Sequence, residues 1–482
     1  MNARPVLRLI SIMLTVLGLA IGLCAGIAWL CADPWQVRFG MVASACIVLA
    51  VGLSTFVLTR GPVDLSRRDG FGIVTFGWLA AAILGSLPFI LTGVITDPVA
   101  AIFETMSGFT TTGASVLTDL EAIPRSVLFW RALTHFFGGM GVLVLCVAIL
   151  PLLGVGGMQI YRAEMPGPSK DRLTPRIATT AKLLWGVYVF LCVAEAVLLR
   201  VGGMDWFDAF CHAFATMATG GFSTRTASVA AYGSAYIETV IIVFMFLAGI
   251  NFALNFRALL GRPLCYFRDP EFRFYLGTWL VATAIVVLSI YRTVYPSLSY
   301  SIRAAFFQTT SVMTTTGFCT EDFDRWPGAS KVVLILLMFI GGCAGSTGGG
   351  IKNIRILVLV KKALREITLF MQPQAVMKVK IGREPVSQDV ISHISGFFIV
   401  FMLIFAGGTL VMTLFTPDLQ TALTSVIATL GNIGPGLGGV GAVQNYAAIP
   451  TGGKAFLTVL MLMGRLELYT VLIVLLPRFW KK

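Results

Sequence analysis

Long runs without a charged residue recur along the whole chain, and they constrain its fold more than any other feature. Five of them exceed the roughly 20 residues that a helix needs to cross a bilayer. With 57% apolar and only 12% charged residues, the chain is typical of a polytopic membrane protein. We expect about ten spans, the first of them retained because no cleavage site follows it. The five runs are Leu9–Ala32, Phe39–Thr59, Phe71–Thr96, Ala132–Tyr161 and Val390–Pro417.

The net charge of +13 is distributed in alternate loops. This positive-inside pattern indicates that the basic residues orient the chain in the membrane and do not bind nucleic acid. It predicts that both termini are cytoplasmic. Anionic lipid headgroups would account for the same charges. The basic loops hold Arg60, Arg67 and Arg68; Lys170, Arg172 and Arg176; Arg257, Arg262 and Arg268; and Lys361, Lys362, Arg365, Lys378, Lys380 and Arg383, while the intervening loops hold Asp119, Glu121, Asp205, Asp208, Glu321, Asp322 and Asp324.

A polar Thr/Gly turn occurs four times at a spacing of roughly 100 residues, which is the signature of a repeat array. Each turn follows an apolar piece of about a dozen residues, such as Val99–Phe109 or Thr421–Leu430. Such a piece is too short to cross and suits a re-entrant segment. The turns are FTTTGAS (109–115), MATGGFS (217–223), MTTTGFC (313–319) and GNIGPG (431–436), aligned on Gly113, Gly220, Gly317 and Gly434.

The sequence therefore predicts an all-α polytopic membrane protein. Four tandem units of span, re-entrant loop and span would surround a central pore, because non-helical backbone at membrane depth must be buried in protein or line water. Two extra spans precede the array. The predicted divisions are residues 1–70 for the two N-terminal spans and residues 71–178, 179–272, 273–386 and 387–482 for the four repeats.

The chemistry of the turns fits a filter for cations. Each short helix would direct its negative C-terminal end inward, and extended Thr-Gly backbone can point carbonyl oxygens at an ion. No acidic residue lies in any turn, so a ring of carboxylates is not the selecting element. The alternative is that these small residues merely allow close helix packing in the membrane.

The stretch GGCAGSTGGGIK, Gly341–Lys352, interrupts a run that otherwise reads as a span. A broken backbone there must face protein or the pore, which predicts a mobile gate on the cytoplasmic side of the filter. A passive kink is the main alternative. A phosphate-binding P-loop is disfavoured because the G-K-[ST] sequence is missing.

Arg465 lies within the last apolar run, Phe456–Leu476. A central arginine costs about 2.5–3.5 kcal/mol on insertion scales and normally faces water or a partner. Glu467 is two residues away and points elsewhere on a helix, so it is a poor partner. A cation facing the conduit would repel other cations, and pairing with loop carbonyls is a compatible second role.

Other polar residues indicate less. His135, His212 and His393 are expected to be structural, and Glu104, Glu195 and Glu238 could shape an outer mouth. The nine cysteines are scattered singly, without a CxxC pair, which favours packing over metal binding or disulfides.

The four-repeat layout, the TTG-type turns, GGCAGSTGGG, RAEMPGPSKD (162–171) and GRLELYT (464–470) resemble the TrkH branch of the Trk/Ktr/HKT potassium transporters over essentially the whole chain. The longer filter TVGYG of potassium channels is absent, and the fourth turn carries Asn and Ile followed by Pro435. The resemblance assigns the potassium filter to Thr111, Thr112 and Gly113; Ala218, Thr219 and Gly220; Thr315, Thr316 and Gly317; and Asn432, Ile433 and Gly434.

The resemblance also implies a gating loop with Arg465 beside it. The gate residues are Gly341, Gly342, Gly345, Ser346, Thr347, Gly348, Gly349, Gly350 and Arg465. It further implies a homodimer and a cytoplasmic TrkA-type regulatory subunit. ATP, ADP or NAD would act only through that subunit, because this chain has no nucleotide fingerprint of its own.

The sequence thus predicts the ion-translocating subunit of a potassium uptake system in the bacterial inner membrane. Its partners would be the lipid bilayer, a second copy and the regulatory subunit, with no nucleic acid. A carrier that couples potassium to sodium or protons is the alternative. Carriers usually have inverted repeats and buried carboxylates at the midplane, whereas these repeats share one orientation. An enzyme is not expected, because the spans contain no paired aspartates, HExxH motif or Ser/His pair.

Overall fold

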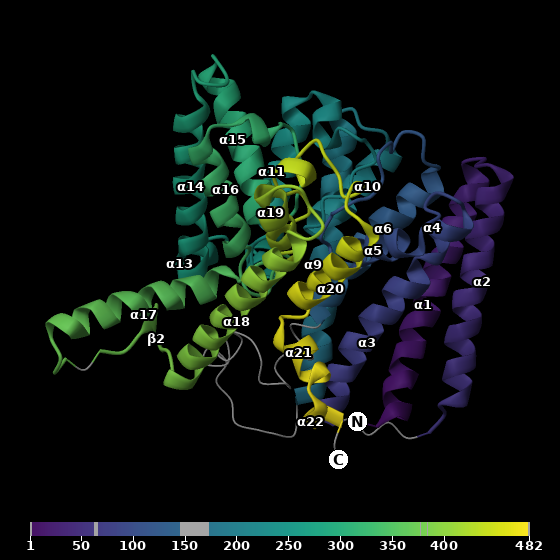
Figure 1. The fold of residues 1–482 in the computed structure, drawn as a ribbon, viewed down its shortest axis with the longest axis horizontal. Coiled ribbons are helices and arrows are strands. Elements are labelled where there is room, and N and C mark those ends of the chain that lie inside the picture. The colour runs from purple at the N-terminus through teal and green to yellow at the C-terminus, as the bar shows by residue number, and fades with distance from the viewer. Residues whose placement is uncertain (1, 62–65, 145–172, 376, 383, 481–482) are drawn as a thin grey trace.

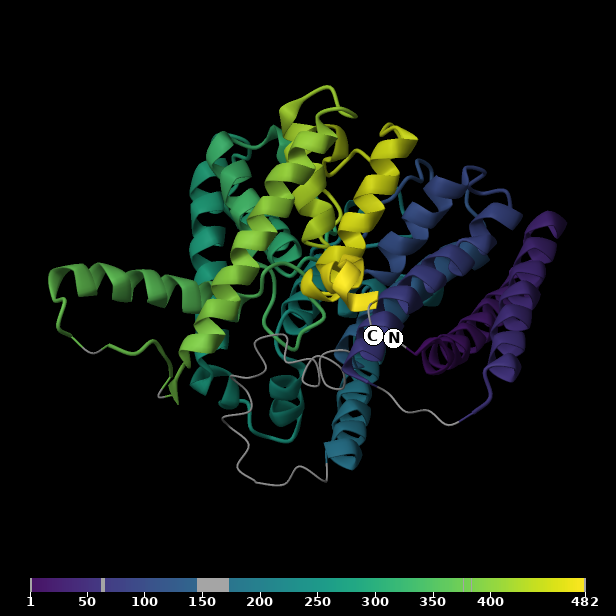
Figure 2. The ribbon, with the colours of Figure 1, turned by 60° about the horizontal axis from the view of Figure 1, so that its bottom comes forward.

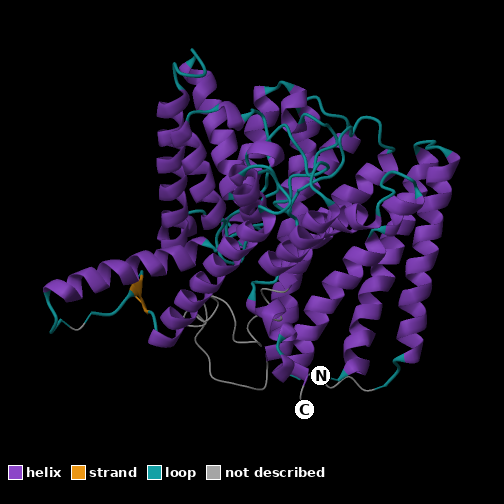
Figure 3. Ribbon diagram, in the orientation of Figure 1, coloured by secondary structure: helices purple, strands orange, loops and turns teal. Residues whose placement is uncertain are grey.

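The computed structural model describes residues 2–61, 66–144, 173–375, 377–382 and 384–480. They form an almost entirely helical protein with one short strand pair, β1 (Lys380–Ile381) and β2 (Glu384–Pro385), as Figure 3 shows. The predicted all-α class is confirmed. The motif at 162–171 and the part of the run Ala132–Tyr161 beyond Val144 lie outside the described residues.

Two long helices begin the chain and pack against each other at one edge of the molecule (Figure 1). Their outward faces remain apolar, with Trp35 70% and Leu58 83% exposed. Such a surface belongs in lipid rather than in water. These helices are α1 (Ala3–Leu30) and α2 (Trp35–Leu58), and they pack on α3 (Arg67–Gly85) and α4 (Leu87–Leu91).

After these helices, the order long helix, short helix, turn, helix occurs four times. The elements of the first two units are α3, α5 (Pro98–Phe109) and α6 (Arg125–Val144), then α9 (Leu173–Val201), α10 (Trp206–Met217) and α11 (Ala235–Ala248). Those of the last two are α14 (Pro270–Ile290), α15 (Leu298–Met313) and α16 (Gly328–Ile340), then α18 (Gln388–Met412), α19 (Leu419–Leu430) and α20 (Thr451–Arg465). The remaining elements of the described residues are α12 (Phe252–Leu259), α13 (Cys265–Arg268), α17 (Asn353–Met371), α21 (Tyr469–Leu475), α22 (Pro477–Trp480) and the 3₁₀ turns Ser228–Tyr232, Phe323–Arg325 and Gly438–Val440.

The short helices start at side-chain caps. Asp97, Asp205, Ser297 and Asp418 each accept a hydrogen bond from a backbone N–H in the first turn of α5, α10, α15 and α19. Capping of this kind satisfies donors that a helix start leaves open. The predicted short pieces at Val99–Phe109 and Thr421–Leu430 are therefore confirmed as helices. They are mostly buried, whereas the long helices around them expose apolar faces.

Among the described residues, six helices are long and apolar enough to cross a membrane, or up to eight if two bent pairs each count as one span. The expectation of about ten is higher for two reasons. Helix α16 has only 13 residues because the glycine loop ends it, and α6 reaches the edge of the described region.

Two apolar stretches among the described residues are not continuous spans. The chain bends by 111° between α11 and α12, and the last apolar run, Phe456–Leu476, bends by 118° between α20 and α21. Asn251 ends the first by capping α12, accepting from Ala253 N at 2.8 Å. At the second break Glu467 and Leu468 have positive φ values of 58° and 42°, which a helix cannot accommodate.

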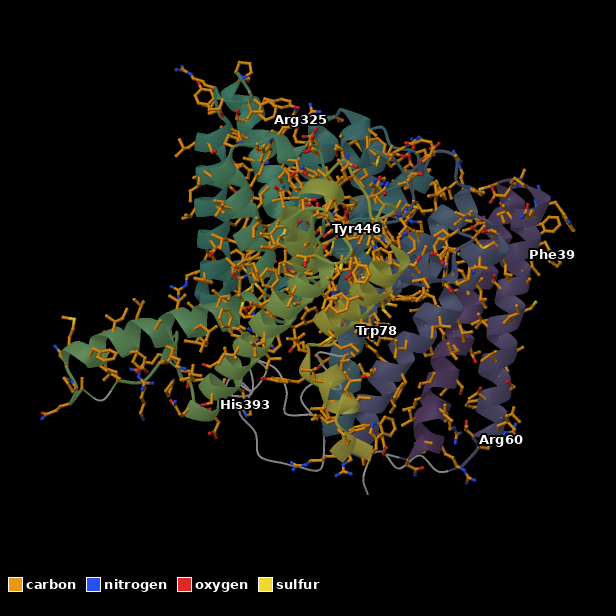
Figure 4. The ribbon with its side chains drawn as sticks, viewed as in Figure 1. Phe39, Arg60, Trp78, Arg325, His393 and Tyr446 are labelled. Carbon is orange, nitrogen blue, oxygen red and sulfur yellow. The ribbon has the colours of Figure 1, made fainter. Side chains whose placement is uncertain are left out.

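Helix α17 extends sideways from the body, and both Figures 1 and 2 show it as a lateral arm. The two chain ends lie beside each other in both views. Arg60 and His393 lie in the lower part of Figure 4, and Tyr446 and Arg325 lie in the upper part. The loops between the helices gather in the upper centre (Figure 3), where the four turns meet.

Candidate functional site

The four Thr/Gly turns meet in a closed ring. One glycine of each turn lies so close to the next turn that a Cβ atom on it would fall within 2.0–2.6 Å of a carbonyl oxygen there. The contacts run from the first turn to the second, third and fourth and back to the first. The pairs are Gly113 with Gly220 O, Gly221 with Thr316 O, Gly317 with Ile433 O and Gly434 with Thr112 O.

The backbone follows the same path in all four turns. The first residue of each triplet is left-handed, with φ between 50° and 60° at Thr111, Thr219, Thr315 and Asn432. The second donates its N–H five residues back into the short helix at 2.8 Å, as in Thr112 N to Ser107 O, Gly220 N to Ala215 O, Thr316 N to Ser311 O and Ile433 N to Ala428 O. The third is a glycine with positive φ, Gly113, Gly221, Gly317 or Gly434.

This geometry corrects the alignment of the second turn. The triplet equivalent to the others is Thr219, Gly220 and Gly221, not Ala218, Thr219 and Gly220. Ala218 is instead the residue that ends α10. The positive φ of 77° at Gly221 marks it as the counterpart of Gly113, while Gly220 occupies the place that Thr112 fills in the first turn.

All four short helices end at this ring, since each triplet begins two residues after the last residue of its helix. Their C-terminal carbonyls, and the negative ends of their helix dipoles, therefore converge on one region. This region is the place where a cation without its water shell would be stabilised.

Above the ring, hydrogen bonds between neighbouring repeats close the outer side. Tyr446, labelled in Figure 4, donates its hydroxyl to Gly434 O at 2.7 Å and its N–H to Ser115 O at 2.8 Å. Gly438 N donates to Asp324 at 3.0 Å, and burial raises the pKa of this carboxyl group. The hollow on this side is lined by the four ring glycines Gly113, Gly221, Gly317 and Gly434 and by residues such as Arg131, Arg225, Cys319 and Tyr446.

Below the ring, the glycine loop lies directly against the ends of the short helices. Thr347 Oγ1 donates to Met217 O at 2.9 Å, and Gly350 N donates to Gly431 O at 3.0 Å. Gly349 N donates to the hydroxyl of Thr315, a ring residue, at 2.7 Å. The loop thus binds to the second, third and fourth repeats on the side opposite the outer hollow.

The loop is held from its other flank by the bend between α11 and α12. Cys343 N donates to Gly249 O at 2.8 Å, and Phe252 N donates to Gly345 O at 3.0 Å. Glu271, on α14, accepts from the backbone N–H of Ala344 and of Ile354 at 2.7 and 3.1 Å. The bend that the sequence did not predict therefore makes room for the loop and binds it.

Arg465 is buried at 4% exposure and contacts the loop directly. Its Nη1 donates to Thr347 O at 2.7 Å and its Nη2 to Gly138 O at 3.2 Å. Pairing with a loop carbonyl, the second role considered for this arginine, is thus observed. Glu467 is indeed not its partner; it forms an ion pair with Arg355 at the start of α17.

A hollow lies beside Arg465 on the loop side of the ring. Its lining includes backbone of Gly348–Gly350, and it includes the charged side chains of Lys352 and Glu467. The Lys352 ammonium donates to Gly348 O. Positive groups therefore outnumber negative ones in the lining of this hollow.

Sequence reasoning missed several residues that hold this site. His212 is structural as expected, bonded to Asp208 O at 2.8 Å and to Ser223 Oγ at 3.0 Å. His135 differs, because neither ring nitrogen has a hydrogen-bond partner among the described residues. It stacks on Phe222 with ring centroids 4.1 Å apart and packs against Gly220. The paired charges of Arg355 with Glu467 and of Arg131 with Glu104 are separated too widely in sequence to be matched by pattern.

Known proteins share this arrangement. The TrkH family, described as cation transport proteins, matches residues 39–482. The potassium uptake protein TrkH of the Escherichia coli Trk system is 46% identical over 426 residues, covering 87% of each chain, and that of Halomonas elongata is 41% identical over 487 residues, covering all of each. The crystal structure of the potassium transporter TrkH from Vibrio parahaemolyticus superposes over the full length of each chain with a TM-score of 0.91 at 37% identity. With this ring, this loop and these relatives, the chain is a multi-pass membrane protein that belongs to the TrkH family of cation transport proteins.

Proposed function

We propose that this chain carries potassium into the cell by channel-like permeation through the ring of four turns. Its relatives are named as potassium uptake proteins of Trk systems, which supports a role in potassium transport. The observation that carries the proposal is the ring itself, in which four left-handed glycines press against the carbonyls of the neighbouring turns.

In this proposal the backbone carbonyls of the ring replace part of the water shell of a potassium ion. The filter consists of the triplets that start at Thr111, Thr219, Thr315 and Asn432. The fourth turn differs from the others because Asn432 Nδ2 donates to Thr112 Oγ1 at 3.0 Å and to Met461 O at 2.9 Å. One side of the ring is thereby fixed by an amide where the others have threonine.

The glycine loop, residues 341–350, acts as the gate in this proposal. The Thr347 hydroxyl of the loop occupies the carbonyl end of α10, and the backbone N–H of Gly350 occupies that of α19, directly below the ring. Arg465 adds a positive charge at the same level, which opposes the passage of another cation. Opening requires the loop to withdraw and to release its hydrogen bond with Arg465.

The proposal places the protein in the bacterial inner membrane with both termini in the cytoplasm. The adjacent chain ends and the basic character of alternate loops support this orientation. A homodimer and a cytoplasmic TrkA-type subunit that binds ATP, ADP or NAD complete the system. The basic loops of the inner side would provide its docking surface.

A carrier that couples potassium to sodium or protons is the second candidate, and one observation favours it. Glu195 is a fully buried carboxyl group on the spanning helix α9, beside Thr216 of α10. Buried carboxyl groups within a membrane often relay protons. A proton-coupled carrier would require this group to change its protonation state during each cycle.

The test is transport by the purified protein in liposomes. Rubidium influx should exceed sodium influx, and a planar bilayer should show single-channel current steps. Smooth current without steps, together with rubidium influx that depends on an imposed proton or sodium gradient, would support the carrier. Absence of selective rubidium influx in liposomes and of potassium-dependent growth in a strain lacking its own importers would refute both candidates.

The regulatory partner is tested separately by copurification from native membranes. A cytoplasmic nucleotide-binding protein should copurify, and its nucleotide should alter the open probability of the reconstituted complex. Fully regulated flux from this chain alone would contradict the need for a partner.

A further inference from the structure

A buried ion pair lies behind the outer side of the ring, and we propose that it is a positioning device that determines how well the first two turns discriminate potassium from sodium. Glu104 on α5 and Arg131 on α6 are only 1% and 2% exposed. Arg131 Nε lies 2.8 Å from Glu104 Oε1. The inference rests on the proposed function and names residues that control which cation the ring accepts.

The guanidinium group of Arg131 binds both of the first two turns. Nη1 donates to the backbone carbonyl of Ser223 at 3.0 Å, and Nη2 donates to the hydroxyl of Ser115 at 3.2 Å. Ser115 and Ser223 stand at equivalent places, two residues after the ring glycines Gly113 and Gly221. One side chain therefore fastens the same point of two neighbouring turns to each other.

Glu104 completes the arrangement from the short helix. Its two carboxylate oxygens accept from Ser115 Oγ at 3.0 Å and from Val116 N at 2.9 Å. The Arg131 guanidinium also lies 4.0 Å above the ring of Phe222. A planar fork presents donors from three separate nitrogens to these acceptors, whereas the three donors of an ammonium group diverge from a single nitrogen. Since both groups are removed from water, their attraction is weakly screened.

The other repeats have no carboxyl group at this position. The residues at the position of Glu104 are His212, Gln308 and Ser425. His212 Nε2 is bonded to Ser223 Oγ at 3.0 Å, and Gln308, in the amide orientation that satisfies its neighbours, accepts from Thr320 N at 2.8 Å. Ser425 bonds within its own helix, to Ala422 O at 2.9 Å. The first repeat thus has a buried ion pair at this position, where the others have histidine, glutamine and serine.

Selectivity depends on this ion pair because the strand after each glycine holds the ring carbonyls in place. If discrimination comes from cavity size, a ring that contracts around a smaller ion accepts sodium more readily; if it comes from the number and field of the carbonyls, a displaced turn changes how many carbonyls reach the ion. Loosening Ser115 and Ser223 together should let two of the four turns contract.

Two substitutions separate the geometry of the pair from its charge. Glu104→Gln keeps the volume but leaves the buried Arg131 without its counter-ion. Arg131→Lys keeps the charge but loses the fork. Each should lower the ratio of potassium to sodium permeability, measured from reversal potentials in bilayers, by about tenfold, equivalent to ~1.4 kcal/mol. Ser115→Ala, which leaves both charges in place, should lower it in the same direction.

The matched control is the ion pair of Arg303 with Glu238, which joins α15 to α11 at 3.1 Å. Within the part of the chain that the structure describes, neither side chain is hydrogen-bonded to a ring turn. Arg303→Lys, which retains the charge of this pair, should therefore keep the parental permeability ratio.

If Glu104→Gln loses selectivity while Arg131→Lys keeps the parental ratio, the pair serves only to neutralise a buried charge. That result would overturn the positioning role. Parental ratios in both variants, or equal loss in the control pair, would also overturn it. If neither variant reaches the membrane, Ser115→Ala decides, and a parental ratio in that variant refutes the proposal. A conducting parent with unaffected variants would leave the proposed function intact, whereas a parent without rubidium flux would refute both.

Discussion

Gly221→Ala and Gly220→Ala should differ in whether a second substitution can reverse the loss of selectivity, although the two glycines are neighbours. The structure makes Gly221 the ring glycine and Gly220 the counterpart of Thr112. Damage at Gly221 should be intrinsic to the backbone. Damage at Gly220 should come from one side chain and should therefore be reversible.

The magnitude at Gly221 follows from two costs. Its φ of 77° would cost a residue with a Cβ about 1–2 kcal/mol. The new Cβ would also lie 2.0 Å from Thr316 O, and relief of such a clash typically costs about 1–3 kcal/mol. Because the obstacle is the backbone of the next turn, the ring itself must deform. If ~1.4 kcal/mol of this strain distinguishes the potassium-bound from the sodium-bound ring, selectivity falls about tenfold.

At Gly220 the obstacle is different. Its φ lies outside the left-handed range, and a Cβ there would meet the imidazole ring of His135, 2.4 Å from Nδ1. Gly220→Ala alone should therefore impair transport by displacing that ring. In the double variant with His135→Ala the methyl group enters the vacated space, and the selectivity of the single His135→Ala variant should return.

The assay is competitive influx of rubidium and sodium into liposomes at matched protein levels. His135→Ala should restore selectivity to Gly220→Ala and give no relief to Gly221→Ala. Parental selectivity in Gly221→Ala, combined with an irreversible loss in Gly220→Ala, would refute this alignment of the second turn and restore the one expected from the sequence.

Three other perturbations address the ring and the loop. Gly113→Ser should raise sodium uptake relative to potassium or abolish transport, and an unchanged ratio in a folded variant would contradict the assigned filter. Removal of part of Gly345–Gly350, or Arg465→Ala, should raise basal rubidium flux about tenfold for each ~1.4 kcal/mol of barrier lost. The effects of the two changes together should be less than additive. Flux at or below that of the parent in both variants would mean that the loop is a passive kink. Glu467→Gln should also raise basal flux, because it removes the ion-pair partner of Arg355 at the exit of the loop, and parental flux would show that this pair does not hold the loop.

The short helices and their turns could be predicted because they combine a length that cannot cross a membrane with residues that cannot continue a helix. The position of the glycine loop followed from the same reasoning, since Gly341–Gly350 has no helical propensity in the middle of an apolar run. These features are local, so the sequence contains them directly.

The alignment of the second turn could have been predicted from the spacing between the residue that caps each short helix and the ring glycine. In three repeats the aspartate that caps the short helix stands sixteen residues before the ring glycine, as Asp97 does before Gly113 and Asp205 before Gly221. Counting from the cap would have selected the second glycine of the ATGG sequence. Counting from the threonines selected the first.

The breaks in the last span and after α11 were not predictable from hydropathy. Between Arg465 and Tyr469 the sequence has no glycine or proline, and the bend becomes understandable only when Arg465 and Glu467 are seen to bind the loop and α17. The contact of Arg131 with Glu104 and Ser223 is of the same kind. It depends on how repeats meet in space, which no local pattern records.

In the proposed mechanism, the hydrogen bonds beneath the ring make the loop a competitor of the transported ion. Thr347 and Gly350 donate to the carbonyls of Met217 and Gly431, which are acceptors of the type that a dehydrated cation needs. A carbonyl that already accepts a hydrogen bond from the loop is a weaker ligand for an ion. Binding of the loop and binding of a potassium ion on this side of the ring therefore oppose each other. By thermodynamic reciprocity, an ion that binds better when the loop is withdrawn must also favour its withdrawal. In the proposed mechanism the pore is therefore closed by a ligand that belongs to the same chain, and the transported ion competes with that ligand.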